Sequence, residues 1–272
     1  MNFHQHFLTA NPCYKAGRSI KVKGLMLHSV GCPQPDPMVF IKNWNSASYD
    51  RACVHGFVGG TEAYETLPML STPGTAHRGW HGGGSSNNTH IGVEMCEPSC
   101  IKYTGGASFT CTDKAKAVAF VEQTTQTAVE LFAKLCKFHG LDPLAPGVIV
   151  SHAEGHKLGI ATNHGDPEHL WRGLGMDYNM DKFRAAVAAE MEDDMTKEQV
   201  LEIIKEYEAG KTEQNPGEWS QSDREWAEQN GIITGFGNGK MGYQAPCTRE
   251  MMVAFLHRLW KVVKAYIDGK AG

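Results

Sequence analysis

Three short apolar segments of this chain each end in an ionisable side chain, and they constrain its fold more than any other feature. Residues 25–28 read Leu-Met-Leu-His, residues 91–94 read Ile-Gly-Val-Glu, and residues 148–152 read Val-Ile-Val-Ser-His. Apolar runs of this length with branched side chains are typical of strands buried in a sheet. Because a strand end holds a side chain rigidly, the segments predict a sheet that carries reactive groups at strand ends.

The remaining elements of the first 190 residues follow from the spacing of apolar side chains. Thr112 is the expected N-cap of the longest helix, and Gly140 is its stop. Residues 70–90 are dense in Gly, Ser, Thr, Asn and His, which predicts a long surface loop, and such loops are often functional. The expected strands are 20–27, 54–58, 63–67, 91–95 and 148–150, and the expected helices are 37–46, 112–140 and 180–192.

Charge is distributed unevenly along the chain. Residues 1–190 carry 16 basic and 16 acidic side chains, residues 192–228 carry 4 and 12, and residues 229–272 carry 6 and 2. Such a shift marks a change of module. We therefore expect a main domain over residues 1–190, a charged helical linker over 191–214, and a small, mainly helical domain over 215–272. No basic cluster is large enough to indicate nucleic-acid binding.

Composition narrows the class of protein. Apolar residues make up 41% of the 272 residues and charged residues 21%, as in globular proteins. No run approaches the roughly 20 apolar residues of a membrane-spanning helix. The first six residues lack the basic cluster and apolar stretch of a secretory signal, so we expect synthesis in the cytoplasm without a signal peptide. The eight cysteines are spread over a chain too long to depend on disulfides, which favours free thiols.

The side chains at the segment ends are of the types that bind a metal. Catalytic zinc usually takes three protein ligands and leaves a fourth position for water, whose pKa it lowers toward neutrality. His28, His152 and Asp166 can supply that set if the two strands that carry the histidines lie side by side. Glu94 would then be an uncoordinated base that takes a proton from water and returns it to a leaving group. The arrangement as a whole indicates a zinc hydrolase.

Other ligand sets within the same stretch stay open. His152 and His156 are spaced to bind a metal together on a helix, but the acid between them is misplaced for the zincin pattern and Gly155 weakens a helix. His164 lies two residues before Asp166 and His169 three residues after it. Spacing alone excludes neither of these as a ligand.

These residues resemble the type 2 family of zinc-dependent N-acetylmuramoyl-L-alanine amidases, which shares its fold with peptidoglycan recognition proteins. The resemblance runs from about residue 18 to residue 190. It implies an α/β fold with a mixed central β-sheet flanked by helices. The motifs occur in family order: the strand ending in His28, Val-His-Gly-Phe at 54–57, Trp-His-Gly-Gly at 80–83, Asn88 before Ile-Gly-Val-Glu, then His152 and Asp-Pro at 166–167.

The resemblance also implies an activity and a set of roles. The family hydrolyses the amide between the lactyl group of N-acetylmuramic acid and the L-alanine of the stem peptide, with Zn²⁺ as the cofactor. Glu94 would pass the proton to the departing alanine nitrogen. The implied metal ligands are His28, His152 and Asp166, and the implied substrate contacts are His55, Trp80, His81 and Asn88.

Two positions depart from the family pattern. Many relatives carry a lysine two residues before the third ligand, where this chain has His164. A histidine can donate the same hydrogen bond to a tetrahedral oxyanion. Some relatives carry a catalytic tyrosine just before the histidine equivalent to His55, where this chain has Val54. Glu94 and His164 are therefore the expected catalytic side chains.

Residues 215–272 resemble a different family, the S-layer homology modules that bind cell-wall carbohydrate. Trp226-Ala227, the run from Asn230 to Gly237 and Thr-Arg-Glu at 248–250 carry the likeness, although such modules usually come in threes. The resemblance implies carbohydrate contacts at Trp226 and Arg249. The last helix expected here has apolar residues on one side, which suits a packed core or a homodimer face and also a membrane-active helix.

The combined prediction is a peptidoglycan hydrolase with a wall-targeting module, namely a phage or prophage endolysin that reaches the wall at host lysis. Its expected partners are bacterial peptidoglycan and a secondary cell-wall carbohydrate. One alternative is a cytoplasmic amidase that recycles muropeptides, for which a wall-targeting module would have no use. The other is a peptidoglycan-binding protein without catalysis, which usually lacks a metal ligand.

Overall fold

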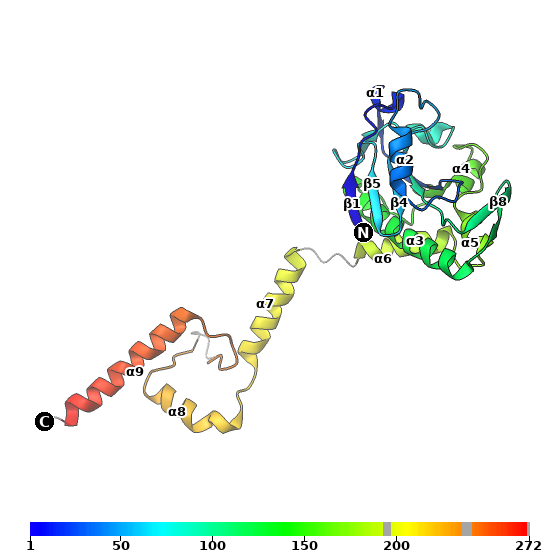
Figure 1. Ribbon diagram of the computed structural model, residues 1–272. Helices are drawn as coiled ribbons and strands as arrows, with labels where there is room; N and C mark the ends of the chain where they lie inside the picture. Colours follow the sequence, from blue (N-terminus) through cyan, green and yellow to red (C-terminus); the bar gives the residue numbers. More distant parts are fainter. Residues whose placement is uncertain (193–196, 236–240, 271–272) are drawn as a thin grey trace. The chain divides into compact units, whose positions relative to one another are not determined.

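The computed structural model describes residues 1–192, 197–235 and 241–270, and the chain divides into two compact units, Met1–Asp194 and Met195–Gly272 (Figure 1). Each unit is described by itself. Among the described residues, no helix is both long enough and apolar enough to cross a membrane.

A mixed six-stranded sheet forms the centre of the first unit (Figure 1). Neighbouring strands are parallel except for the antiparallel pair β4 and β5. This mixed sheet with flanking helices is the fold class that we predicted. Across the sheet the strands are β1 (Asn2–Gln5), β5 (Glu62–Glu65), β4 (Gly56–Gly59), β7 (His90–Met95), β3 (Gly24–Ser29) and β10 (Ile149–Ser151).

Helices cover both faces of this sheet, which is why its central strands are apolar on both sides. Successive residues of β4 face opposite sides of the sheet. Val58 belongs to the larger core with α3, whereas the Phe57 ring stacks on Phe40 of α2 with the ring centroids 5.5 Å apart. All six residues of β3 are buried. The helices are α1 (Pro12–Lys15), α2 (Pro37–Trp44), α3 (Lys114–His139), α4 (His152–Lys157), α5 (Glu168–Gly173) and α6 (Met180–Glu192).

Smaller elements lie along the edges of this unit. β2 (Ser19–Lys21) pairs with β6 (Thr75–His77), and β8 (Ile101–Gly105) pairs with β9 (Ser108–Cys111) as a hairpin. A short 3₁₀ helix, η1 (Ser85–Asn88), leads into β7. The predicted long loop over residues 70–90 therefore contains β6 and η1.

The longest helix begins one residue later than expected. Asp113, rather than Thr112, is its N-cap, and the Asp113 carboxylate accepts a hydrogen bond from the Lys116 backbone N–H at 3.0 Å. The Thr112 hydroxyl instead donates to the Cys100 carbonyl at 3.1 Å. Gly140 ends the helix as expected, in the left-handed conformation with φ of 66°.

The expected strand over residues 20–27 is divided into β2 and β3. A Cβ built on Gly24 would lie 2.4 Å from the Val148 carbonyl oxygen. The Leu25 N–H donates to that oxygen at 2.7 Å, so glycine at 24 permits β3 to run close to the segment that enters β10. Strand β1 and the β8–β9 hairpin were not predicted, since both are short and mostly exposed to solvent.

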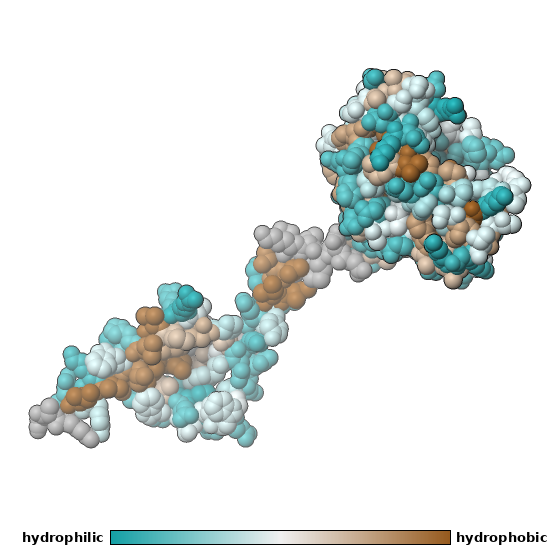
Figure 2. All heavy atoms as spheres, in the orientation of Figure 1, coloured by the Kyte–Doolittle hydropathy of each residue, from teal (hydrophilic) through white to brown (hydrophobic). Residues whose placement is uncertain are grey.

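The second unit is helical in its described part. It comprises α7 (Lys197–Glu213), the 3₁₀ turn η2 (Glu218–Ser220), α8 (Gln221–Gln229) and α9 (Arg249–Lys270). Arg258 of α9 donates to the Ile232 carbonyl at 3.1 Å, which ties α9 to the segment after α8. Phe236 and Gly237 of the predicted carbohydrate-binding motif lie outside the described residues. Figure 2 shows apolar side chains along α9. The exposed large hydrophobic residues of this helix include Val253, Leu256 and Trp260.

Candidate active site

Three adjacent parallel strands bring the predicted reactive residues to one edge of the sheet. β3 is paired with β7 on one side and with β10 on the other, and His28 of β3 is the register partner of Glu94 of β7. Leu27 is the partner of Ser151, so His152 follows at the end of the strand on the other side of His28. The two histidine-bearing strands therefore lie side by side, as the predicted ligand set requires.

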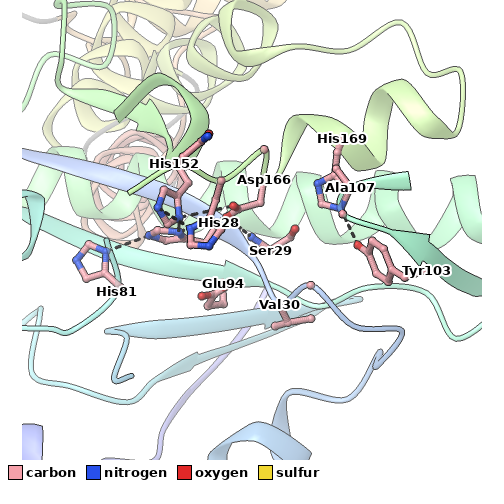
Figure 3. Close-up of a pocket in the computed structure, with 15 residues that line it drawn as sticks. His28, Ser29, Val30, His81, Glu94, Tyr103, Ala107, His152, Asp166 and His169 are labelled. Atoms are coloured by element: carbon pink, nitrogen blue, oxygen red, sulfur yellow. Dashed lines mark hydrogen bonds and ion pairs between the residues drawn. The ribbon is translucent and has the colours of Figure 1, made fainter. Parts of the chain in front are cut away.

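His28, His152 and Asp166 form a compact group of ligand-type side chains (Figure 3). The two Nδ1 atoms are 3.0 Å apart. The Asp166 carboxylate oxygens lie 3.3 Å from His28 Nδ1 and 3.6 Å from His152 Nδ1. One ligand atom from each residue lies within 4.8 Å of the other two. Two imidazole nitrogens and one carboxylate converging in this way match the donor set of a catalytic zinc site.

Asp166 approaches the two histidines from the loop before α5. Burial alone would raise the pKa of its carboxyl group, but the imidazoles of His152 and His28 outweigh burial and hold that pKa well below its usual value. The Ser29 backbone N–H also donates to the carboxylate at 3.3 Å. Asp166 is therefore an anion at neutral pH, which is the form that binds a cation.

Outer hydrogen bonds set the orientation of His28. Its Nε2 lies 3.0 Å from Nδ1 of His81, whose own Nε2 lies 3.1 Å from the His90 carbonyl oxygen. A carbonyl can only accept, so His81 carries its proton on Nε2 and its Nδ1 accepts from His28. This leaves the lone pair of His28 Nδ1 free for a metal. Burial lowers the pKa of His28, which favours the neutral, ligating form.

The space for the His81 ring is provided by a glycine. A Cβ built on Gly92 of β7 would lie 2.4 Å from Cγ of His81, so no larger residue fits at position 92 while His81 keeps its place. His152 has outer partners of its own: its Nε2 lies 3.2 Å from the Thr162 hydroxyl and 3.1 Å from Nδ1 of His164. Each predicted ligand is therefore supported by further polar groups.

Glu94 lies beside this group and lines the same pocket (Figure 3). Its Oε2 atom is buried and has no hydrogen-bond partner within the part of the chain that the structure describes. Burial, followed by the negative charges of Asp166 and Glu97, raises the pKa of Glu94 well above its usual value. A carboxylate of raised basicity with one unpartnered oxygen is suited to accept a proton and to return it.

Of the four predicted substrate contacts, His81 alone lines the pocket. His55 is fully buried, its Nε2 lies 2.6 Å from the His77 carbonyl oxygen, and its Nδ1 accepts from the Gly92 N–H, so it is placed to support β7 and not to touch a substrate. Trp80 pairs with Cys53 through the backbone. Asn88 is exposed outside the pocket and accepts a hydrogen bond from Arg78 at 2.7 Å.

The same geometry distinguishes the predicted metal ligands from the alternative histidines. A short helix, α4, does form at His152–Lys157, because Ser151 and Glu154 make a capping box and Gly155 packs closely on Met26. His156 on that helix is exposed and is not part of the ligand group. His164 is exposed at the pocket, next to His152. His169 lines the pocket from α5 but contacts a different set of residues.

Sequence reasoning missed a second group of side chains at this pocket. The cavity has a volume of about 550 Å³, and Tyr103 and His169 line it together with the ligand group. Their partner Glu97 is fully buried. Tyr103 belongs to the unpredicted β8–β9 hairpin. The polarity of that segment gave no sign that it covers a pocket.

Comparison with known proteins gives a family and a fold. A family model described as N-acetylmuramoyl-L-alanine amidase matches residues 18–169, which is more than half of the chain. No curated protein sequence matches. The hydrolase AmiA of Staphylococcus aureus, solved with its ligand, is 20% identical over 70% of this chain and 83% of that one, with a TM-score of 0.52. A mutant endolysin from Bacillus subtilis is 21% identical over 69% and 99%, with a TM-score of 0.47.

Proposed function

The chain belongs to the N-acetylmuramoyl-L-alanine amidase family, and we propose that it is a zinc-dependent peptidoglycan hydrolase of that specificity. The bond cleaved is the amide between the lactyl group of N-acetylmuramic acid and the L-alanine of the stem peptide. The observation that carries the proposal is the convergence of His28, His152 and Asp166 beside Glu94, whose buried Oε2 atom has no hydrogen-bond partner among the described residues.

The donor set supports zinc as the metal. His28, His152 and Asp166 would hold the ion through two Nδ1 atoms and a carboxylate, a mixture of nitrogen and oxygen donors that suits zinc. When bound, zinc lowers the pKa of water and polarises a carbonyl group. His81 holds the His28 ring in the orientation and tautomer that ligation requires.

Glu94 acts as the general base and then as the general acid. Its buried Oε2 atom takes a proton from the attacking water and passes it to the alanine nitrogen as the amide bond breaks. His28 and Glu94 are partners on adjacent strands, so the base is held beside the first of the proposed metal ligands. His164, exposed at the pocket, donates a hydrogen bond to the oxyanion of the tetrahedral intermediate.

The second unit directs the enzyme to the bacterial wall. Trp226 on α8 is half exposed, and Arg249 at the start of α9 is exposed, so both are accessible to a carbohydrate. The exposed apolar residues of α9 support a contact between two copies of the chain. Together with the amidase unit, this suits an endolysin that is made in the host cytoplasm and lyses the wall. A recycling amidase would gain nothing from this second unit.

Digestion of purified cell wall tests the proposal. Zymograms should show clearing that a chelator abolishes and that zinc restores, and the digest should contain new L-alanine amino termini. Clearing that survives chelation would contradict the metal mechanism. Release of reducing sugars in place of amino termini would contradict the assignment of the bond. Wall binding without any cleavage would favour a binding protein that lacks catalysis.

A further inference from the structure

A hydrogen-bonded cluster of three side chains lies at one wall of the pocket, which two of them line, and it has no role in the proposed reaction. Glu97 follows β7, Tyr103 lies on β8, and His169 lies on α5, so the cluster joins three separate elements. Figure 3 shows Tyr103 and His169 on the side of the ligand group opposite His81. Glu97 is fully buried and His169 is 6% exposed.

The direction of the hydrogen bonds in this cluster follows from its donors and acceptors. The Gly31 N–H donates to Oε1 of Glu97 at 2.9 Å, and the Tyr103 hydroxyl donates to Oε2 at 2.8 Å. Tyr103 has only one hydroxyl proton, and its oxygen lies 2.6 Å from Nε2 of His169. That oxygen must therefore accept from the Nε2–H of His169. Because the neutral ring carries one proton, Nδ1 of His169 is a bare acceptor.

This acceptor has no hydrogen-bond partner among the residues that the structure describes. Nδ1 of His169 is buried and makes no hydrogen bond to any described residue. Burial is also the main cause that lowers the pKa of His169 and favours the neutral ring. The Phe109 ring packs against the imidazole at a centroid distance of 6.3 Å. A buried acceptor without a donor costs free energy, so its retention in a pocket wall calls for a ligand that supplies the donor.

The tip of the β8–β9 hairpin lies next to this part of the pocket. Gly106 and Ala107 of the tip line the pocket together with His169. A Cβ built on Gly165 would lie 3.7 Å from Cβ of Ala107, and the Gly165 carbonyl accepts a hydrogen bond from the His169 backbone. The hairpin tip and His169 therefore line the same part of the pocket.

We propose that His169 is a specificity-determining residue whose Nδ1 accepts a hydrogen bond from an amide N–H of the substrate. Tyr103 and Glu97 act as positioning residues that fix the tautomer and orientation of its ring. The inference rests on the proposed amidase function, because that function supplies a substrate rich in amides. Its amide N–H groups belong to two sources, the backbone of the stem peptide and the acetamido groups of the sugars.

Ester analogues of the substrate test the proposal without changing the protein. In one soluble muropeptide an ester replaces the amide between the first and second stem residues, and in another an acetoxy group replaces the acetamido group of the muramic acid. Each change removes an N–H and keeps the shape. At pH 8, above the pKa of about 7 to which burial raises Glu97, the zinc-loaded full chain should lose about fivefold in kcat/KM with one of the two. The analogue that shows the loss identifies the source of the N–H.

Two variants of His169 test whether the fall in kcat/KM with the ester analogue depends on Nδ1. In His169→Asn an acceptor oxygen takes the place of Nδ1, whereas in His169→Gln an amide can still reach Tyr103 but leaves the Nδ1 position without an acceptor. The Asn variant should keep the fivefold preference for the amide substrate, and the Gln variant should lose it. Zinc content should be equal in both, because neither change touches the ligand group.

The outcomes separate this inference from the function on which it rests. Equal kcat/KM for the parent and both ester analogues would overturn it, and so would an unchanged preference in His169→Gln. Failure of the zinc-loaded chain to cleave the parent muropeptide would instead overturn the amidase function, and this inference with it. If the His169 variants do not fold, the comparison of parent and ester substrates with the unaltered chain still decides.

Discussion

His28 on β3 and Glu94 on β7 are register partners on adjacent parallel strands. The backbone hydrogen bonds of the central sheet therefore hold the first proposed metal ligand and the proposed base at neighbouring strand positions. Loops supply the other groups, Asp166 before α5 and His164 beside it. The part of the site with the strictest geometric demand is thus built on its most rigid elements.

Replacing Glu94 by glutamine should separate metal binding from catalysis. The amide keeps the size of the side chain but cannot accept the proton of water, so hydrolysis should fall by a factor of roughly 10² to 10⁴. Zinc content, measured by atomic spectrometry, should stay the same because Glu94 is not in the ligand group. Glu122→Gln, on the exposed side of α3, is the matched control. Substantial activity in Glu94→Gln would remove this residue from the mechanism.

Replacing His81 by phenylalanine should weaken zinc binding. The variant keeps a ring but loses the acceptor that orients His28, and loss of such an outer partner typically costs about 10- to 100-fold in metal affinity. Competition with a chromogenic chelator measures this directly. His139→Phe removes a histidine that bonds the backbone at Gly74 and Met69, so it should change stability and leave zinc affinity alone. Unchanged affinity in His81→Phe would show that the contact is only structural.

Glu97 should make the stability of the protein depend on pH. Burial raises its pKa from an ordinary 4.5 to about 7, so the folded state binds more protons than the unfolded state between these values. Its contribution to the free energy of unfolding therefore falls as pH rises from 4.5 to 7. Relative to Glu97→Gln, the unaltered chain should gain up to about 3 kcal/mol between pH 8 and pH 5.

Denaturant unfolding of both proteins at the two pH values measures this difference. The comparison with Glu97→Gln is needed because buried histidines such as His55 and His90, whose pKa values burial lowers, destabilise both proteins at acid pH. A constant difference between the two proteins from pH 5 to pH 8 would mean that Glu97 titrates alike in the folded and unfolded states.

Removal of residues 195–272 should weaken binding to the wall and leave hydrolysis of a small soluble muropeptide intact. The described site lies wholly within the first unit, Met1–Asp194, which supports this expectation. Sedimentation with purified walls and a soluble-substrate assay test the two properties separately. Equal loss of both activities would indicate that the second unit serves the stability of the first.

Charged substitutions on α9 test the proposed contact between copies. Leu256 and Trp260 are both about 60% exposed, and replacing each by glutamate should convert a dimer to a monomer in sedimentation equilibrium. Glutamate in place of the exposed Lys264 is the control for the change in charge. A monomer before any substitution would contradict the proposed contact.

The sequence was most informative where an ionisable residue stood at the end of a predicted strand. His28, Glu94 and His152 could be placed because each follows a continuous apolar run, and such runs become adjacent strands in a buried sheet. The β8–β9 hairpin carries no such pattern, so Tyr103 could not be placed. His169 was noted only for its distance from Asp166, because its contact with Tyr103 joins residues from distant parts of the chain.

Motif order was a weaker guide to the role of a single residue. His55 occupies a family motif, yet it is fully buried and both of its nitrogens bond to the backbone. The sequence could not separate a histidine that faces a pocket from one that lies behind a strand. Whether a histidine faces the pocket depends on how its segment packs against β4 and β7. Only the folded chain determines this packing.

The close fit between Gly92 and the His81 ring limits the routes by which this protein can evolve. Any side chain at position 92 expels the imidazole that orients His28, and any loss of His81 leaves a hole beside β7. A functional descendant can replace both residues only if His81 is replaced first and Gly92 is replaced by a larger residue afterwards. The order of the two mutations is thereby fixed, and the intermediate must survive without the imidazole that orients His28.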